Sequence, residues 1–334
     1  MKPFFQLILT GVMVTAYAVP AADSQSLIGV PVLGYVFDPA AQGIRPVSGT
    51  PGAALIGSPL DFGVALSWSV ISPRQDFAMA TGADGAVRIL ALPPGNFASQ
   101  ILTAAAGVPQ KIVFSPSGET AGLYQPGQAT IQIFTHLPQD AGLAHEINLA
   151  GLTGSLRSAA ISDDGNLALI LAGDEDDATL WLSYGGGDPV PLPAPPGPSA
   201  ASFASGSDNA VLATQDGQMY LLENLATGPT RRPITLRDDR LAKPVAVRFT
   251  PDGKRVYVAT QQGTVAGFGI RSGGATYLSC GCQPSGLFPL HSSTLIRLNE
   301  IADGPLMLLD TAQAEPRMWF VPAIAAAGSG GGAQ

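Results

Sequence analysis

A short turn sequence recurs along this chain and limits the folds that it can adopt. The clearest copy is Phe249–Gly253 (FTPDG), and weaker copies start at Phe114, Ile161 and Ile71. Proline fixes φ at the second turn position, aspartate or serine can hydrogen-bond its own backbone, and glycine accepts a positive φ. Each copy is therefore expected to form a tight hairpin turn between two strands.

The apolar residues just before these turns recur at a regular spacing. They lie at Ile71, Phe114, Ile161, Phe203 and Phe249, at intervals of 43, 47, 42 and 46 residues, and a sixth falls near residue 290. A repeat of roughly 40 to 50 residues matches one four-stranded propeller blade. Short segments within the units are rich in Val, Ile, Thr, Phe and Tyr, as strands are. The spacing predicts an all-β chain, a β-propeller of four-stranded blades.

The number of blades depends on the N-terminal strands. Six units run from about Val64 to Pro322, and the segment Val32–Val47 adds two more strands. These give seven blades if they build a sheet of their own, and six if they complete the last one; we predict seven. The ring is expected to close by pairing these N-terminal strands with the C-terminal stretch Arg317–Val321. The propeller domain is predicted to span residues 26–322.

One copy of the repeat resembles a known family. Pro251–Thr260 (PDGKRVYVAT) is similar to the repeat of bacterial secreted YVTN-type propellers and, more loosely, to WD40-like and TolB-type repeats. No unit carries the Trp-Asp ending of true WD40 repeats. The resemblance implies a propeller over most of the chain. These families include surface-layer, scaffold and sugar-acid lactonase members, so the resemblance leaves the activity open.

The N-terminus has the features of a secretory signal, predicted over residues 1–21. Lys2 supplies a positive charge, Phe4–Ala18 is largely apolar, and small residues follow as a cleavage site. The alternative is an uncleaved anchor, but this apolar stretch is shorter than the roughly 20 residues of a spanning helix. The mature chain is expected to be secreted or periplasmic, without a membrane span. Residues 323–334, rich in Gly and Ala, are predicted to be a disordered tail.

The charge of the chain bears on its partners. A formal net charge of −8 disfavours nucleic acid and anionic membranes. The expected partner is a protein, a peptide or a glycan, bound by a monomer, and no cofactor is expected.

The pair Cys280 and Cys282, separated by one glycine, is the sharpest local feature. In an exported protein, two nearby thiols are expected to form a disulfide. Unpaired or intermolecular thiols, and a redox or metal role, remain alternatives. A zinc site needs further ligands, and the sequence has no second Cys pair and no His-x-x-x-His pattern. No metal site is predicted.

Polar residues also recur in the turns between the second and third strands of the units. In a four-stranded meander these turns share a face with the blade-to-blade connections, one of which holds the Cys pair. Amide and carboxylate groups around a propeller mouth could bind a sugar, a peptide or a cation, although such residues are also common in hairpins. The candidate binding residues are Asp84, Gln125, Asp174, Asp176, Asp177, Asp216, Gln261 and Asp303.

No catalytic residue is assigned from the sequence. The chain has three histidines and no Gly-x-Ser-x-Gly motif. We therefore predict an exported, non-catalytic binding or scaffold propeller that uses the amide- and acid-rich turn face and the Cys280/Cys282 loop. One alternative is a propeller hydrolase or lactonase with a metal or carboxylates at the channel mouth; another is a redox-sensing adaptor. Converging carboxylates on the channel axis would favour the enzyme, and an axis lined by backbone, Ala and Gly would favour binding.

Overall fold

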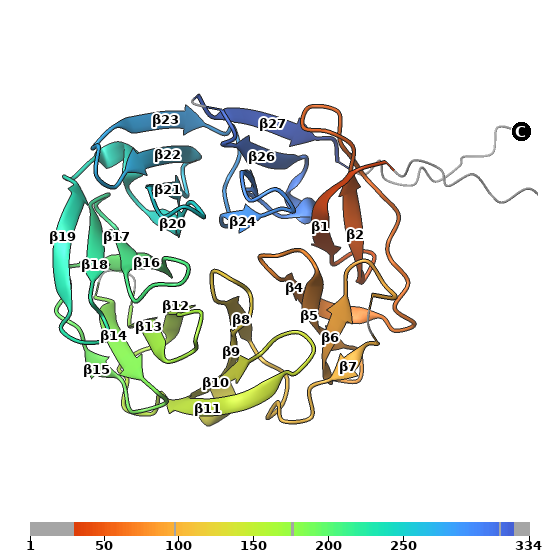
Figure 1. The fold of residues 1–334 in the computed structure, drawn as a ribbon, viewed down its shortest axis with the longest axis horizontal. Coiled ribbons are helices and arrows are strands. Elements are labelled where there is room, and N and C mark those ends of the chain that lie inside the picture. Colours follow the sequence, from red (N-terminus) through yellow and green to blue (C-terminus); the bar gives the residue numbers. More distant parts are fainter. Residues whose placement is uncertain (1–29, 97, 175–176, 314, 324–334) are drawn as a thin grey trace, which may run out of the picture. The chain divides into compact units, whose positions relative to one another are not determined.

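Seven antiparallel sheets are arranged in a ring in the computed structural model (Figure 1). The structure describes residues 30–96, 98–174, 177–313 and 315–323. The predicted signal peptide and the predicted tail from residue 324 onward lie outside the described residues. The predicted fold class, an all-β propeller with seven blades, is confirmed.

The blades follow one another along the chain, and in each the first strand lies nearest the centre of the ring (Figure 1). Blade 1 has three strands, and blades 2 to 7 have four. The strands of blades 1 to 4 are β1 (Val32–Asp38), β2 (Gly43–Ser48) and β3 (Leu55–Ile56); β4 (Leu66–Ile71), β5 (Phe77–Gly82), β6 (Val87–Ala91) and β7 (Gln100–Ile101); β8 (Lys111–Phe114), β9 (Ala121–Gln125), β10 (Thr130–Thr135) and β11 (Gly142–Asn148); β12 (Leu156–Ile161), β13 (Leu167–Ala172), β14 (Thr179–Tyr184) and β15 (Val190–Pro191).

Blades 5 to 7 continue the same pattern, and three short 3₁₀ turns accompany the strands. These elements are β16 (Pro198–Phe203), β17 (Ala210–Thr214), β18 (Met219–Glu223) and β19 (Thr230–Thr235); β20 (Pro244–Phe249), β21 (Arg255–Thr260), β22 (Thr264–Gly269) and β23 (Ala275–Ser279); β24 (Phe288–Pro289), β25 (Leu295–Arg297), β26 (Leu306–Asp310) and β27 (Arg317–Val321); and η1 (Pro126–Gln128), η2 (Asp239–Leu241) and η3 (Ile301–Asp303). No helix among the described residues is long and apolar enough to cross a membrane.

The repeated turn forms as predicted between the first and second strands of a blade. In blade 6 the amide of Gly253 donates to the carbonyl of Thr250 at 2.9 Å, and Gly253 has φ of 65°. The Asp252 carboxylate accepts hydrogen bonds from the Thr250 hydroxyl at 2.6 Å and the Lys254 amide at 3.1 Å. These hydrogen bonds pair the polar groups of the turn with one another, so the same turn can form wherever the sequence supplies the same residues.

The core lies between neighbouring blades. All six residues of β5 and of β13 are buried, because each middle strand is covered by the blades on both sides. One apolar cluster joins blades 2 and 3 through residues that include Phe77, Leu123 and Phe134. A single sheet cannot bury both of its faces, whereas a closed ring of sheets can. This explains why the repeat must occur several times along the chain before both faces of each sheet are buried.

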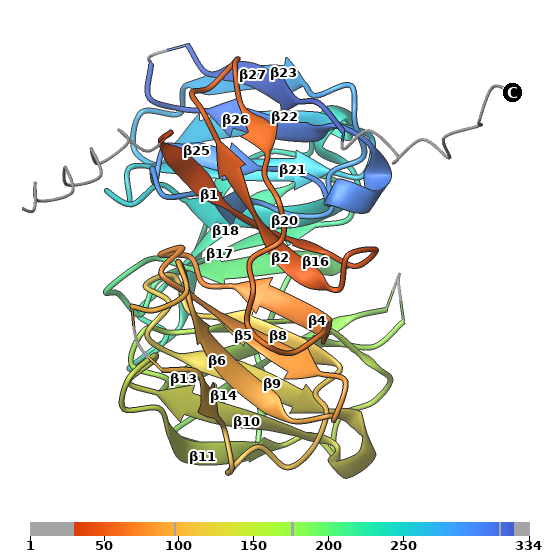
Figure 2. The same ribbon diagram turned by 90° about the vertical axis from the view of Figure 1, so that its right-hand side faces the viewer.

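The ring does not close by the predicted strand pairing. β27 pairs with β26 in its own blade, and β1, β2 and β3 form a separate sheet. Figure 2 shows this sheet between the blade of β26 and β27 and the blade of β4, β5 and β6. The short strand β3, from the chain that follows β2, pairs with β2 in this sheet, and β27 does not join it. The expectation of paired N- and C-terminal strands was therefore wrong.

Side chains and single hydrogen bonds close the ring instead. The buried Gln75 accepts a hydrogen bond from the Tyr35 amide at 2.6 Å and donates one to the carbonyl of Pro289 at 2.7 Å. The amide of His291 donates to the carbonyl of Leu33 at 2.9 Å. One apolar cluster joins both ends of the chain, through residues such as Val36, Leu308 and Val321.

Candidate functional site

The innermost strands surround a central channel. It has a volume of about 670 Å³, and its lining comes from blades 1 to 4, 6 and 7. Most of the wall is apolar, with Trp68, Val113, Phe114, Leu287 and Phe288 among its residues. This volume falls within the range of small-molecule sites in proteins.

Four cationic side chains project into this mostly apolar wall: Lys111 from β8, Arg157 from β12, Arg248 from β20 and Arg297 from β25. Arg297 is neutralised by Glu300 at 2.7 Å, and its guanidinium lies 4.2 Å from the centre of the Phe288 ring. None of the other three forms an ion pair with any residue that the structure describes. The channel is therefore positive although the whole chain is acidic.

Lys111 and Arg157 lie together on neighbouring blades. The Lys111 ammonium donates hydrogen bonds to the carbonyls of Leu156 and Arg157. Burial lowers the pKa of Lys111, and the positive charge of Arg157 adds to this effect. Arg157 occupies an irregular position of β12, because the register with β13 shifts between Leu156 and Ser158. A bulge of this kind re-aims a side chain, and here the side chain reaches the channel.

Arg248 lies nearer the other end of the channel. Burial lowers its pKa to about 10, and the Asp163 carboxylate acts in the opposite direction. Arg248 therefore keeps its charge at neutral pH. Asp163 itself accepts hydrogen bonds from the amides of Ser117 and Gly206, both at 2.7 Å, and from the hydroxyl of Ser205 at 2.9 Å. It joins the turns of three blades and lies too far from Arg248 for an ion pair.

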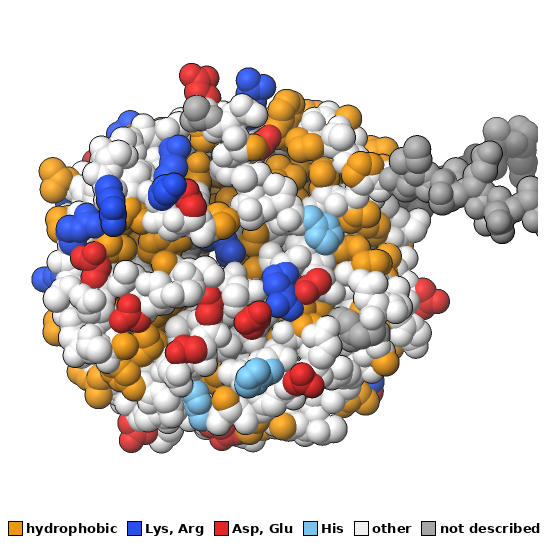
Figure 3. All heavy atoms as spheres, in the orientation of Figure 1, with side chains coloured by type: hydrophobic (Ala, Val, Ile, Leu, Met, Phe, Trp, Pro, Cys, Tyr) orange, Lys and Arg blue, Asp and Glu red, His pale blue; other side chains and the backbone are white. Residues whose placement is uncertain are grey.

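The two ends of the channel open on different faces. We call the face with turns such as Thr250–Gly253 the repeat-turn face, and the face with turns such as Gln261–Gly263 the amide face. A cavity of about 220 Å³ on the repeat-turn face shares Arg248 with the channel. Figure 3, an axial view, shows a hollow near the centre of the ring with a Lys or Arg side chain inside it.

The cavity at the amide face is smaller than the channel and more polar. It has a volume of about 300 Å³ and shares Arg157 and Ser158 with the channel. Gln215, Lys243 and Gln261 surround it, from the turns and connections of blades 5 and 6. The side-chain amide of Gln215 donates a hydrogen bond to the Ser199 hydroxyl at 3.1 Å, while the Gln261 and Lys243 side chains are exposed. This rim offers several hydrogen-bond donors to an incoming group.

The residues predicted from the sequence have different environments. Gln261 lies at the amide-face cavity. Gln125 is buried and donates to the carbonyl of Gly107 at 3.1 Å, so it holds its own loop. Asp216 accepts from the Thr214 hydroxyl at 2.6 Å and belongs to its own turn. Hydrogen bonds from Arg88 hold the pKa of Asp84 well below its ordinary value.

The remaining acidic candidates do not join this cavity among the described residues. Asp174 and Asp177 are exposed in the turn between β13 and β14. Asp176 and the side chain of Asp303 lie outside the described part of the chain. No group of three His, Cys, Asp or Glu residues is placed to hold a metal ion among the described residues.

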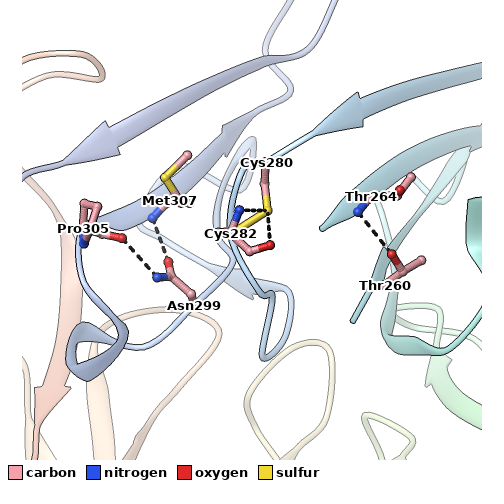
Figure 4. The surroundings of a disulfide bond; sticks show 7 residues. All are labelled: Thr260, Thr264, Cys280, Cys282, Asn299, Pro305 and Met307. Atoms are coloured by element: carbon pink, nitrogen blue, oxygen red, sulfur yellow. Dashed lines mark hydrogen bonds between the residues drawn. A yellow bond between two sulfur atoms is a disulfide. The ribbon is translucent and has the colours of Figure 1, made fainter. Parts of the chain in front are cut away.

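The Cys pair is bonded in the structure and lies beside the turn between β21 and β22. The Cys280 amide donates to the carbonyl of Gly263 at 2.9 Å, and Cys280 is 4% exposed, packed between blades 6 and 7. Figure 4 shows the bond between Thr260 and Thr264 on one side and Asn299 on the other. This loop lies on the amide face, as the strand order predicts.

The channel cations were not predicted from the sequence. The expected alternatives for the axis were converging carboxylates or backbone with Ala and Gly. The axis carries Lys111, Arg157 and Arg248 instead. A signal was present, because each of these charges lies in a first strand of otherwise small or apolar residues, such as VAVRF at the end of β20.

Comparison with known proteins supports the fold alone. No model of a protein family matches the chain, and no curated protein matches it in sequence. A similar solved structure is that of a functionally unknown protein from Desulfotomaculum acetoxidans DSM 771, with 15% identity and a TM-score of 0.56. The match covers 87% of this chain and 100% of that chain. Membership of the YVTN-type family stays a prediction.

Proposed function

We propose that this protein is an exported binding propeller that receives its ligand on the amide face, around the mouth of the channel. The propeller fold fits a binding or scaffold role. The observation that carries the proposal is the polar cavity of about 300 Å³ at this mouth, where Arg157, Lys243 and Gln261 meet. Arg157 comes from β12 in blade 4, whereas Lys243 directly precedes β20 and Gln261 follows β21 in blade 6, so the site forms only when these blades are packed together.

The chemistry of the rim is that of recognition. Arginine, lysine and glutamine supply N–H donors in different directions, and carboxylate, phosphate or hydroxyl oxygens of a partner can accept them. The Cys280–Cys282 loop lies against Gly263, two residues after Gln261. It therefore stiffens the turn that presents Gln261, which lowers the entropy lost when a partner binds. This gives the bonded cysteines a supporting role in the proposed site.

Export rests on the sequence of residues 1–21, and it is tested by the mass of the chain recovered from cells. The proposal expects a periplasmic or secreted form that lacks the signal segment. A full-length chain retained in the membrane fraction would contradict it. Native mass spectrometry of the same sample tests the expected monomer.

The binding role is tested by pull-down from envelope fractions with the mature chain and two matched variants. Lys243→Asn removes a charge from the amide-face rim, and asparagine tolerates the φ of 55° at this position. Lys254→Asn removes a charge from the repeat-turn face, where the side chain is 79% exposed. The proposal expects a partner that is lost with Lys243→Asn and kept with Lys254→Asn. Equal recovery with both variants, or equal loss, would contradict it.

A further inference from the structure

The charges of the channel are arranged at two levels along its axis. Arg157 lies four residues before the end of β12, and Lys111 three residues before the end of β8. Arg248 lies only one residue before the end of β20. These strand ends are equivalent positions, because the repeated turn follows each of them. Because Arg157 is the extra residue at the register shift of β12, it lies two to three paired positions from the level of Arg248, and at about 3.3 Å per residue the two backbones are about 7 to 10 Å apart along the axis.

The cavities at the two faces agree with this arrangement. Arg157 is shared between the channel and the amide-face cavity, and Arg248 between the channel and the repeat-turn cavity. Trp68 lies level with Lys111 and Val113 lies level with Arg248, and between the two levels the wall includes Ile112, Ala159 and the polar residue Ser69. The channel therefore carries cations toward both ends within a mostly apolar wall.

Neither arginine has a counter-charge in ion-pair contact among the described residues, and each is only partly exposed. Leaving a partly buried guanidinium without an ionic partner is unfavourable, and an oxyanion of a ligand would supply the missing hydrogen bonds. The Lys111 ammonium has two of its three donors directed at backbone carbonyls, which leaves one for a ligand at the same level.

We propose that the channel binds a small, elongated dianion with an acidic group at each end and an apolar middle, such as an α,ω-dicarboxylate. One acidic group is held by Lys111 and Arg157, the other by Arg248, and the mostly apolar wall covers the chain between them. This inference deepens the proposed function, on which it rests for the amide face as the side of entry. Lys243, exposed at that rim, is placed to attract the ligand before it enters.

The test is calorimetric titration of the mature protein with straight-chain dicarboxylates from succinate to dodecanedioate, and with inorganic phosphate. The expected result is tightest binding at an intermediate chain length, weakened by added salt. Removing one charged hydrogen-bond partner is expected to weaken binding about tenfold or more. Arg157→Gln and Arg248→Gln each remove one end of the site. Arg231→Gln, on the exposed outermost strand β19, is the matched control and should bind as the wild type does.

Several outcomes would overturn the inference. These are no binding of any dicarboxylate, binding that does not depend on chain length, or phosphate binding as tight as the best dicarboxylate. Equal effects of Arg157→Gln and Arg231→Gln would also contradict it, provided that thermal unfolding shows both variants folded. If dicarboxylate binding fails while the pull-down still depends on Lys243, the proposed function stands and only the ligand class is wrong.

Discussion

Replacing Gly263 by alanine tests how tightly the disulfide loop is packed against the amide-face turn. Gly263 has φ of 87°, and a Cβ at this position would lie 2.5 Å from the carbonyl oxygen of Cys282. Gly253 is the matched control, because it has φ of 65° and a Cβ there would meet nothing within 4 Å. Both variants bear the cost of a left-handed backbone, and only Gly263→Ala also bears the clash.

The expected losses of stability follow from the cost of the left-handed backbone and the cost of the clash. A left-handed conformation costs an alanine about 1 to 2 kcal/mol. Forcing an extra methyl group into packed surroundings costs about 1 to 3 kcal/mol more. We therefore expect Gly253→Ala to lower the free energy of unfolding by about 1 to 2 kcal/mol, and Gly263→Ala by about 2 to 5 kcal/mol. At about 2 °C per kcal/mol for a domain of this size, the difference is measurable as a shift in Tm.

The assay is urea unfolding of both variants, with and without a reductant. Reduction frees the Cys282 carbonyl to move, so it should diminish the effect of Gly263→Ala and leave that of Gly253→Ala unchanged. The clash at Gly263 is refuted if Gly263→Ala is no more destabilising than Gly253→Ala in oxidising buffer. It is also refuted if reduction changes both effects equally.

Three further predictions concern the closure of the ring, the disulfide and pH. Gln75→Leu removes the hydrogen bonds that link the Tyr35 amide and the Pro289 carbonyl through Gln75. Because both buried partners lose a hydrogen bond, the free energy of unfolding should fall by about 2 to 4 kcal/mol. A loss below about 0.5 kcal/mol in urea unfolding would count against this closure of the ring. Cys282→Ser should lower it by about 1 to 2 kcal/mol in oxidising buffer, and an unchanged urea midpoint would show that the bridge is not structural. Burial lowers the pKa of His145, so the unfolded chain binds a proton that the folded protein does not, and stability should fall as the pH drops below about 6.5. His145→Gln should reduce this fall between pH 7.5 and 5.5, and an identical slope would argue against the burial of His145.

The fold could be predicted because its signals are local. The turn chemistry of Phe249–Gly253 depends only on neighbouring residues, and the spacing of such turns fixes the size of a blade. The closure of the ring depends on contacts between distant segments. The two-residue strand β3, at Leu55–Ile56, carries no periodic pattern. The sequence therefore provided no reason to expect that it pairs with β2.

The candidate site was only partly predictable for a related reason. Gln261 belongs to a recognisable turn, so its face could be derived from the strand order. Arg157 and Arg248 look like solvent-facing residues of ordinary strands when they are considered one blade at a time. The assembled ring brings Arg157 and Arg248 to a common axis. Their partial burial at that axis, without an ion-pair partner, is what points to an anionic ligand.

A crystal structure of the mature protein with the best-binding dicarboxylate tests most directly whether the two charged levels of the channel hold one ligand. Density is expected along the channel axis, with one carboxylate at Lys111 and Arg157 and the other at Arg248. Density for a ligand that reaches only one of these levels, or that lies outside the channel, would contradict this expectation.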